Sequence, residues 1–309
     1  MIEKILITGR LFNVMETLLV DKLDKELRFL PEAEVSDIDL KWADAFVSFR
    51  PTANFQFWNL KWVHSLGAGV DSFLLNRAWK KDVLLTRTVC SFGRKISEYC
   101  LSYVLRDLQL HNVFQKLKVT KIMKPLEPLA ISTQKFVIFG TGSIGQEVAR
   151  NFRSFGANVT GVSLSGSQKE YFNQVVPINK VNTILQDANW VINTLPLTLH
   201  TNKLFTSDLL KHLNNACFIN VGRGASVDED SLLRALDNKN LRLAVLDVVS
   251  KEPLAYDSPL WSRPEITLTP HISAITSPEE AVDCFLNTLK NVDQERFPLN
   301  NQVEVDKGY

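Results

Sequence analysis

The sequence predicts an α/β protein with two parallel sheets, and three observations lead to this prediction. Short apolar runs alternate with segments that carry apolar residues at helical spacing, a pattern typical of strands joined by crossover helices. A glycine-rich turn lies between such a run and such a segment, within residues 135–163. The length of 309 residues exceeds one average domain and favours two.

The first 93 residues carry the pattern of a small α/β domain. Apolar runs predict strands at 4–8, 45–49, 62–65 and 83–86. Helical spacing from Leu11 to Leu30 predicts a helix after the first strand. Loops follow two strands, at Arg50–Pro51 and Gly67–Asp71, and such loops line ligand clefts in parallel sheets. We therefore expect a flavodoxin-like domain without its own phosphate loop.

The segment from Ile96 to Phe114 predicts one helix with two apolar sides. One side carries Ile96, Tyr99, Tyr103 and Val104, and the other Leu101, Leu105 and Leu108. Soluble helices usually show a single apolar stripe, so a second stripe must be buried against a second packing partner. A homodimer interface would provide it, and full burial within one subunit is the alternative. Residues 121–132, with two prolines, are expected to form a connecting loop.

The glycine-rich turn has the spacing GxGxxG, with Gly140, Gly142 and Gly145 between a buried run and a helical segment. In such a turn the first glycine permits the sharp bend, the second lets a pyrophosphate approach the backbone, and the third allows close packing of the helix. The helix N-terminus then offers N–H groups to anionic oxygens. We predict a dinucleotide site that includes Thr141, Ser143 and Ile144; an ordinary glycine-rich βα turn is the alternative.

The rest of the chain completes the pattern of a Rossmann-type doubly wound parallel sheet. Six strands are predicted, at 135–139, 157–163, 189–193, 216–221, 241–248 and 265–268. Helical segments are predicted between them at 181–188, 207–213 and 228–239. The last helix, 278–291, follows the finished sheet, so we expect the chain to return to the first domain. The predicted division is a substrate domain of 1–93 plus 275–309 and an NAD(P)-binding domain of 94–274.

Three polar residues follow successive strands of this second domain: Arg223, Glu252 and His271. Because the carboxyl ends of parallel strands meet at one edge, we expect these side chains to converge beside the cofactor, in the cleft between the domains. A guanidinium can hold a carboxylate or carbonyl, an imidazolium can donate a proton, and a carboxylate can orient that imidazole. Taken singly, such residues are more often structural: Arg223 as a surface ion pair, Glu252 as a solvated loop residue and His271 as a turn cap.

The composition argues against several classes of protein function. The net charge of +1 and the absence of long apolar runs argue against nucleic-acid and membrane partners. Four cysteines lie far apart in the sequence without a CxxC pair, and no secretory leader is recognisable, so we expect a cytoplasmic protein without a metal site.

Several motifs together resemble the D-isomer-specific 2-hydroxyacid dehydrogenases. The motifs are Gly67–Asp71, the GxGxxG turn, Asn220–Gly224 with Val227–Glu229, Leu246–Val248 with Glu252–Leu254, and Pro270–His271. Their order matches over nearly the whole chain, and residues 67–73, 270–278 and the C-terminal Gly308-Tyr309 resemble the branch that reduces glyoxylate and hydroxypyruvate.

The resemblance implies roles for individual residues. Arg223 would bind the substrate carboxylate and carbonyl, His271 would donate the proton, and Glu252 would be its partner. Asp247 would face the nicotinamide. The backbone of Ala68, Gly69 and Val70 would bind the substrate carboxylate, with Phe49 and Arg50 along the side-chain pocket. The cofactor would also lie along Thr194, Leu195, Pro196 and Val221.

The predicted cofactor is NADP(H), with NAD(H) as a weaker alternative. The strand after the glycine turn ends at Ser163, where NAD-specific members of the family place an acid. Ser163, Ser165 and Lys169 offer hydroxyls and one positive charge, but no arginine fork. We therefore expect a moderate preference for NADPH; a loop that accepts either cofactor is the alternative.

Two kinds of function fit these observations. The leading one is a reductase of small 2-oxo acids, such as glyoxylate or hydroxypyruvate, that forms the D-2-hydroxy acid. The second is a non-catalytic NAD(H) sensor resembling the C-terminal binding protein corepressors. An enzyme of the same fold that acts on formate or phosphite is a weaker possibility.

Overall fold

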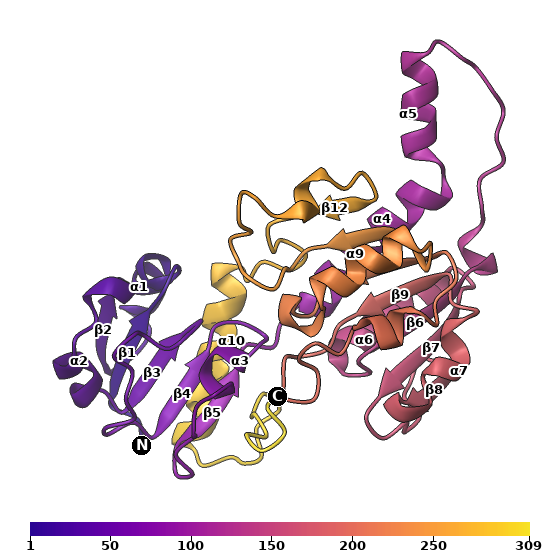
Figure 1. Cartoon of the computed structure of the whole chain (residues 1–309). Helices are drawn as coiled ribbons and strands as arrows, with labels where there is room; N and C mark the ends of the chain where they lie inside the picture. Colours follow the sequence, from indigo (N-terminus) through magenta and orange to yellow (C-terminus); the bar gives the residue numbers. More distant parts are fainter. The chain divides into compact units, whose positions relative to one another are not determined.

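The computed structural model describes all 309 residues, which divide into two compact units. Unit 1 comprises Met1–Phe92 and Thr276–Tyr309, and unit 2 comprises Gly93–Ile275. The boundaries expected from the sequence were 93/94 and 274/275. Each unit has its own parallel sheet with helices around it, so the α/β fold is confirmed (Figure 1). None of the helices combines the length and apolarity that crossing a bilayer requires.

Unit 1 contains a five-stranded parallel sheet in the order β2-β1-β3-β4-β5, which is the flavodoxin-like order. The strands are β1 (Lys4–Thr8), β2 (Glu26–Leu30), β3 (Ala45–Ser48), β4 (Trp62–Ser65) and β5 (Leu84–Arg87). The helices are α1 (Phe12–Leu19), α2 (Asp37–Trp42), α3 (Asp71–Leu74) and α10 (Pro278–Asp293).

The predicted helix from Leu11 to Leu30 is wrong in its second half. Helix α1 ends at Leu19, and Glu26–Leu30 forms the edge strand β2. All five β2 residues pair in register with β1, from Lys4 with Glu26 to Thr8 with Leu30. Apolar spacing alone cannot reveal this strand, because its hydrogen-bond partner lies in β1.

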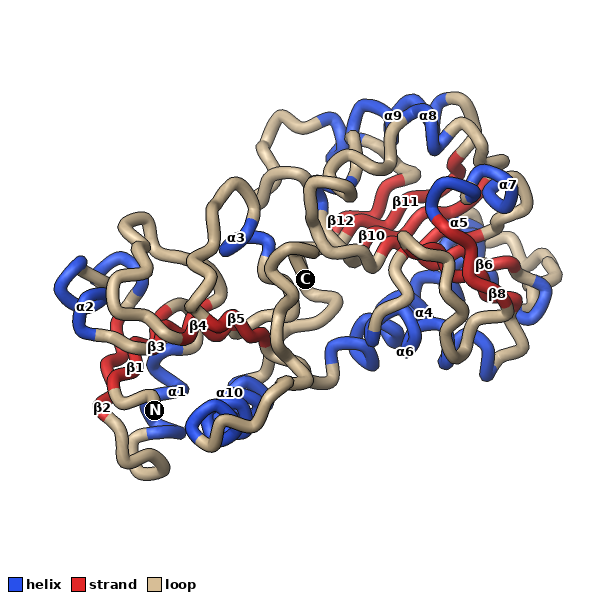
Figure 2. The backbone as a smooth tube through the Cα atoms, turned by 90° about the horizontal axis from the view of Figure 1, so that it is seen from below, coloured by secondary structure: helices blue, strands red, loops and turns tan.

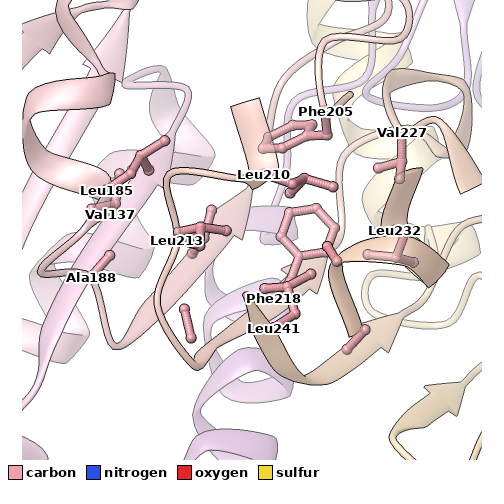
Figure 3. Packing of buried hydrophobic residues seen from close by; sticks show 14 of the residues in the cluster. Val137, Leu185, Ala188, Phe205, Leu210, Leu213, Phe218, Val227, Leu232 and Leu241 are labelled. Carbon is pink, nitrogen blue, oxygen red and sulfur yellow. The ribbon is translucent and has the colours of Figure 1, made fainter. Parts of the chain in front are cut away.

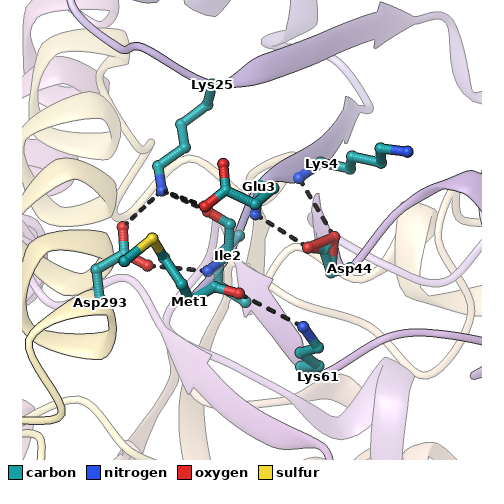
Figure 4. A network of polar contacts seen from close by, with 8 residues as sticks. All are labelled: Met1, Ile2, Glu3, Lys4, Lys25, Asp44, Lys61 and Asp293. Carbon is teal, nitrogen blue, oxygen red and sulfur yellow. Dashed lines mark hydrogen bonds and ion pairs between the residues drawn. The ribbon is translucent and has the colours of Figure 1, made fainter.

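Helices cover both faces of the unit 1 sheet, with α1 and α10 on one face and α2 and α3 on the other (Figure 2). Phe285 of α10 stacks on Trp62 of β4, with ring centroids 5.6 Å apart and planes 4° apart. Polar contacts join the end of α10 to the residues just before β1 and β2 (Figure 4). Asp293 accepts a hydrogen bond from the Ile2 N–H at 2.9 Å and pairs with Lys25 at 3.0 Å. The end of the chain is therefore part of unit 1.

Unit 2 contains a seven-stranded parallel sheet in the order β12-β11-β10-β9-β6-β7-β8. The strands are β6 (Lys135–Phe139), β7 (Asn158–Ser163), β8 (Gln174–Pro177), β9 (Trp190–Asn193), β10 (Ala216–Asn220), β11 (Leu241–Leu246) and β12 (Ile266–Leu268). The doubly wound Rossmann order is confirmed, but the predicted count of six strands is wrong. The additional strand is β8, an edge strand that pairs with β7.

The predicted single helix from Ile96 to Phe114 is also wrong. It is divided into α4 (Phe92–Leu108) and α5 (His111–Val119), and Leu110 between them has the left-handed φ of 58°. Helix α4 lies on the sheet and buries Ile96 and Val104. Helix α5 buries no residue and extends away from the sheet (Figure 1).

The remaining helices of unit 2 are α6 (Ser143–Ser154), α7 (Asn182–Leu185), α8 (Ser207–Leu210) and α9 (Glu229–Asp237). Helices α4 and α6 cover one face of the sheet, and α7, α8 and α9 cover the other (Figure 2). On the second face, Leu185, Leu210 and Leu232 of these helices join Phe205 and Phe218 in one apolar core (Figure 3). This core makes the sheet a rigid base for the loops at its carboxyl edge.

Candidate functional site

The glycine-rich turn between β6 and α6 has the geometry that a pyrophosphate site requires. Gly140 has a φ of +99°, which favours glycine. A Cβ on Gly145 would lie 1.9 Å from the Gly140 carbonyl oxygen, whereas a Cβ on Gly142 would meet no atom within 4 Å. Gly142 is also the N-cap of α6, and no side chain caps that helix end. The turn is thus packed where the helix meets the strand and open where a phosphate would approach.

The other predicted cofactor residues lie on the neighbouring strand ends of unit 2. The Thr194 hydroxyl donates to the Phe139 carbonyl at 2.9 Å and so ties the β9 loop to the glycine turn. Leu195 and Pro196 follow it and are half-buried, as are Thr194 itself and Ile144. Thr141 and Val221 are buried, whereas Ser143 is exposed. These residues therefore surround one edge of the sheet, as the doubly wound fold requires.

The loop after β7 contains only neutral and basic side chains from Ser163 to Lys169. The Ser163 hydroxyl accepts a hydrogen bond from the Gly166 N–H at 3.0 Å, and the hydroxyls of Ser165 and Ser167 are 2.9 Å apart. Ser165 and Lys169 are exposed. The loop can accommodate an anionic group, because no carboxylate lies on it before Glu170.

The structure brings two of the predicted catalytic residues into direct contact. His271 Nδ1 lies 2.9 Å from Glu252 Oε2, and both side chains are partly exposed. Partial burial acts to raise the pKa of Glu252, but His271, the Val249 N–H and the Arg223 guanidinium together lower it below its usual value. The pair can therefore hold a carboxylate against a protonated imidazole.

Arg223 lies on the adjoining loop, after β10, close enough to contribute to that lowered pKa. Its Nη1 donates to the Gly222 carbonyl at 2.8 Å. Its own carbonyl accepts hydrogen bonds from Ser226 Oγ at 2.6 Å and Asn220 Nδ2 at 3.2 Å. These buried partners fix the backbone from which the guanidinium extends.

The loops that carry Arg223 and Glu252 are packed directly against each other. A Cβ on Gly224 would lie 1.9 Å from the backbone of Val249, so only glycine permits this approach. Glu229, at the start of α9, accepts a hydrogen bond from the Ser250 N–H at 2.8 Å. The side chains of Arg223, Glu252 and His271 thus lie on neighbouring loops of unit 2 that contact one another.

Asp247, the residue predicted to face the nicotinamide, is buried directly after β11. Asp247 is 1% exposed, and both of its carboxylate oxygens accept hydrogen bonds. They accept hydrogen bonds from the Thr269 hydroxyl at 2.7 Å and from the N–H groups of Ile272 and Ser273, each at 2.8 Å. Asp247 therefore holds the loop that carries His271.

In unit 1, the turn after β4 presents three backbone donors. The N–H groups of Ala68, Gly69 and Val70 have no hydrogen-bond partner in the chain. The turn is held by other bonds: Ser65 Oγ contacts the Gly67 N–H at 3.3 Å and the Gly69 carbonyl at 3.1 Å. Successive free N–H groups of this kind form a concave site for an anion.

Of the other two predicted substrate residues of unit 1, Phe49 lies beside this turn. Phe49 packs against Gly67 and Gly9, whose added Cβ atoms would each lie 3.6 Å from its ring. The Arg10 guanidinium lies over the same ring, 4.4 Å from its centroid. Arg50 is exposed, and its Nε pairs with Glu32 at 2.9 Å.

The sequence did not single out Tyr99 or Thr269 as members of the polar network around His271. Tyr99 Oη lies 2.6 Å from Thr269 Oγ1. Tyr99 belongs to a predicted apolar stripe of its helix, and the signal that the sequence offers is the position of Thr269 two residues before His271.

Comparison with known proteins identifies the family. Residues 101–273 match the family model described as "D-isomer specific 2-hydroxyacid dehydrogenase, NAD binding domain". Glyoxylate/hydroxypyruvate reductase A of Salmonella newport (strain SL254) is 33% identical over 258 residues, which are 81% of this chain and 82% of that protein.

Two solved structures resemble the chain over its length. A D-isomer specific 2-hydroxyacid dehydrogenase family protein from Aeromonas salmonicida is 30% identical, with a TM-score of 0.84 and coverage of 99% of this chain and 100% of that one. The NADPH-dependent glyoxylate/hydroxypyruvate reductase from Sinorhizobium meliloti, in complex with NADP and sulfate, is 27% identical, with a TM-score of 0.87 and full coverage of both chains. The chain therefore belongs to the D-isomer specific 2-hydroxyacid dehydrogenase family.

Proposed function

We propose that this dehydrogenase reduces a small 2-oxo acid, such as glyoxylate or hydroxypyruvate, to the D-2-hydroxy acid, with NADPH as the preferred cofactor. The observation that carries the proposal is the His271–Glu252 contact of 2.9 Å beside the Arg223 loop. When Nδ1 of an imidazole is hydrogen-bonded to a carboxylate, Nε2 is available to contact a substrate, as proton donation requires.

In this proposal the residues of unit 2 act on the carbonyl. His271 donates a proton to the carbonyl oxygen, and Glu252 stabilises the protonated imidazole through Nδ1. Arg223 binds the carbonyl and carboxylate oxygens with charge-assisted hydrogen bonds and stabilises the negative charge that develops on the carbonyl oxygen. The donated proton and the transferred hydride together account for the two hydrogens gained by the substrate.

The residues around the glycine turn fit a dinucleotide. The open side of Gly142 and the uncapped N-terminus of α6 suit a pyrophosphate, and the bound nicotinamide supplies the hydride. Ser163, Ser165 and Lys169 favour a 2′-phosphate, because a carboxylate at Ser163 would repel it and none is present. The names of the relatives from Salmonella and Sinorhizobium agree with this substrate and cofactor class.

The carboxylate of the substrate fits the turn in unit 1. We assign it to the free N–H groups of Ala68, Gly69 and Val70, with Phe49 and Arg50 along the substrate's side chain. Unit 1 is then the substrate domain and unit 2 the NAD(P)-binding domain. Small 2-oxo acids suit this arrangement because the Phe49 ring already fills the space beside Gly67.

We also propose a homodimer in the cytoplasm. The dimer is supported by α5, which exposes Val113, Phe114 and Val119 and buries no side chain. Apolar side chains on an unpartnered helix favour a second copy of the chain as the cover. Light scattering at micromolar concentration should give twice the mass of the 35.0 kDa chain, and a monomer would contradict the proposal.

The decisive experiment follows the loss of reduced-cofactor absorbance with a panel of 2-oxo acids, each tested with NADPH and NADH. Turnover with glyoxylate or hydroxypyruvate and a higher kcat/KM for NADPH are expected. A protein that binds the reduced cofactor but shows no turnover dependent on a 2-oxo acid would instead be a sensor of the corepressor type.

A further inference from the structure

A chain of hydrogen bonds runs from α4 to the loop that carries His271. Tyr99 Oη lies 2.6 Å from Thr269 Oγ1, which lies 2.7 Å from Asp247 Oδ1. The Asp247 carboxylate also accepts the N–H groups of Ile272 and Ser273. Residues before and after His271 are therefore held by the same buried carboxylate.

The donors in this chain can be assigned from its chemistry. A carboxylate only accepts, so the single proton of the Thr269 hydroxyl is donated to Asp247. The Tyr99 hydroxyl must then be the donor to Thr269. Burial raises the pKa of Tyr99, so this phenol keeps its proton. Tyr99 thus occupies the acceptor side of the Thr269 hydroxyl, whose proton points to Asp247.

The His271 backbone needs such support. Its φ is +56°, in the left-handed region that residues with a Cβ adopt rarely and only where the surroundings hold them. The His271 N–H donates to the carbonyls of Asp247 at 2.9 Å and Thr269 at 3.0 Å, so the same two residues also anchor its backbone. Loss of the Thr269–Asp247 bond would loosen the loop at this position.

We infer that Tyr99 is a positioning residue for His271. By donating to Thr269, it directs the threonine proton to Asp247 and so fixes the 269–273 loop with the imidazole against Glu252. This inference rests on the proposed function, in which the orientation of His271 governs the rate of proton donation.

Tyr103 provides a matched control. It lies one turn along α4, its ring centroid is 4.9 Å from that of Tyr99, and its hydroxyl makes no hydrogen bond in the chain. Tyr99→Phe should lower kcat by about tenfold, since small errors in the position of a catalytic group are costly, and should leave KM for the 2-oxo acid and for NADPH unchanged. Tyr103→Phe should keep the wild-type kcat and KM. Equal kcat values in the two variants would overturn the inference.

A second pair of variants tests the same hydroxyl chain. Thr269→Val removes the link between Tyr99 and Asp247 and should lower kcat at least as far as Tyr99→Phe, whereas Thr269→Ser keeps the hydroxyl and should restore most of it. Equal losses in the valine and serine variants would mean that the methyl group, not the hydroxyl, matters.

The outcomes separate the inference from the proposed function. If the wild-type protein reduces no 2-oxo acid, the proposed function fails. If it does so, and His271→Ala abolishes turnover while Tyr99→Phe behaves like Tyr103→Phe, only the positioning role fails.

Discussion

His64 in unit 1 and His271 in unit 2 are both associated with strands of a parallel sheet, yet their surroundings are opposite. His64 lies within β4 and is fully buried, at 0% exposure. His271 follows β12, and its side chain is 49% exposed and paired with Glu252. The first is surrounded by neutral donors and acceptors, the second by a carboxylate and solvent.

The hydrogen bonds around His64 require a neutral ring. Trp62 Nε1 donates to Thr86 Oγ1, which leaves the threonine proton for His64 Nδ1 at 2.7 Å. His64 Nε2 then donates to Thr88 Oγ1 at 3.3 Å, and Thr88 donates to the Ser65 carbonyl. No carboxylate pairs with the ring, and burial lowers the pKa of His64 to about 3. An imidazole can thus serve packing in one unit and acid chemistry in the other, depending on whether a charge and solvent face it.

The largest predicted effect is the loss of turnover on replacing His271. His271→Ala should lower kcat for 2-oxo acid reduction by about 10²- to 10⁴-fold, the usual contribution of a positioned acid. Its free energy of unfolding should change little, because the side chain is half exposed. Steady-state kinetics and urea unfolding of the same preparation measure both. Near-wild-type turnover would show that another group donates the proton.

His64 should show the opposite behaviour. His64→Leu should lower the free energy of unfolding by about 2–4 kcal/mol at pH 7.5, because the hydroxyl groups of Thr86 and Thr88 lose a buried partner. It should affect kcat much less than His271→Ala does. Urea unfolding, followed by tryptophan fluorescence, measures the loss.

Acid should destabilise the folded protein through His64. The pKa of His64 is about 3 when folded, against an ordinary value near 6.5, so the unfolded chain takes up the proton first. This contribution to stability is complete above about pH 6.5 and is lost as the pH falls, by about 1.4 kcal/mol per unit until the folded pKa is reached. Between pH 7.5 and 5.5 the wild-type protein should therefore lose more stability than His64→Leu. Equal losses would mean that other groups dominate the acid response.

A smaller effect is expected at Glu252. Glu252→Gln keeps an acceptor for His271 Nδ1 but removes the charge that stabilises the imidazolium, so kcat/KM should fall by about 10- to 100-fold. The unfolding free energy should stay near the wild-type value, because partly exposed ion pairs contribute little. A rate equal to that of wild type would remove Glu252 from the mechanism.

The smallest effect concerns the cofactor. Ser163→Asp should shift the ratio of kcat/KM values toward NADH by about tenfold, because a carboxylate there repels a 2′-phosphate and accepts hydrogen bonds from the ribose hydroxyls. Ser154→Asp, on the exposed end of α6, serves as a control with the same charge change. If the two variants show the same ratio, Ser163 does not contact the adenosine ribose.

The sequence by itself determined the alternation of strands and helices, the glycine turn and the order of Arg223, Glu252 and His271. These features are local: apolar spacing reports which face of an element is buried, and the three glycines are required by the backbone of their own turn. The same local signals ordered the strands well enough to predict a doubly wound sheet, because crossover connections leave few topologies.

Only the tertiary structure decided the rest. The edge strands β2 and β8 form because β1 and β7 supply their hydrogen bonds, and the break at Leu110 separates a helix that lies on the sheet from one that does not. The partners of the Asp247 carboxylate were also decided there, because Thr269, Ile272 and Ser273 come from the loop after the next strand. Sequence patterns encode burial along one element, whereas partners from distant elements are chosen only when the chain is packed.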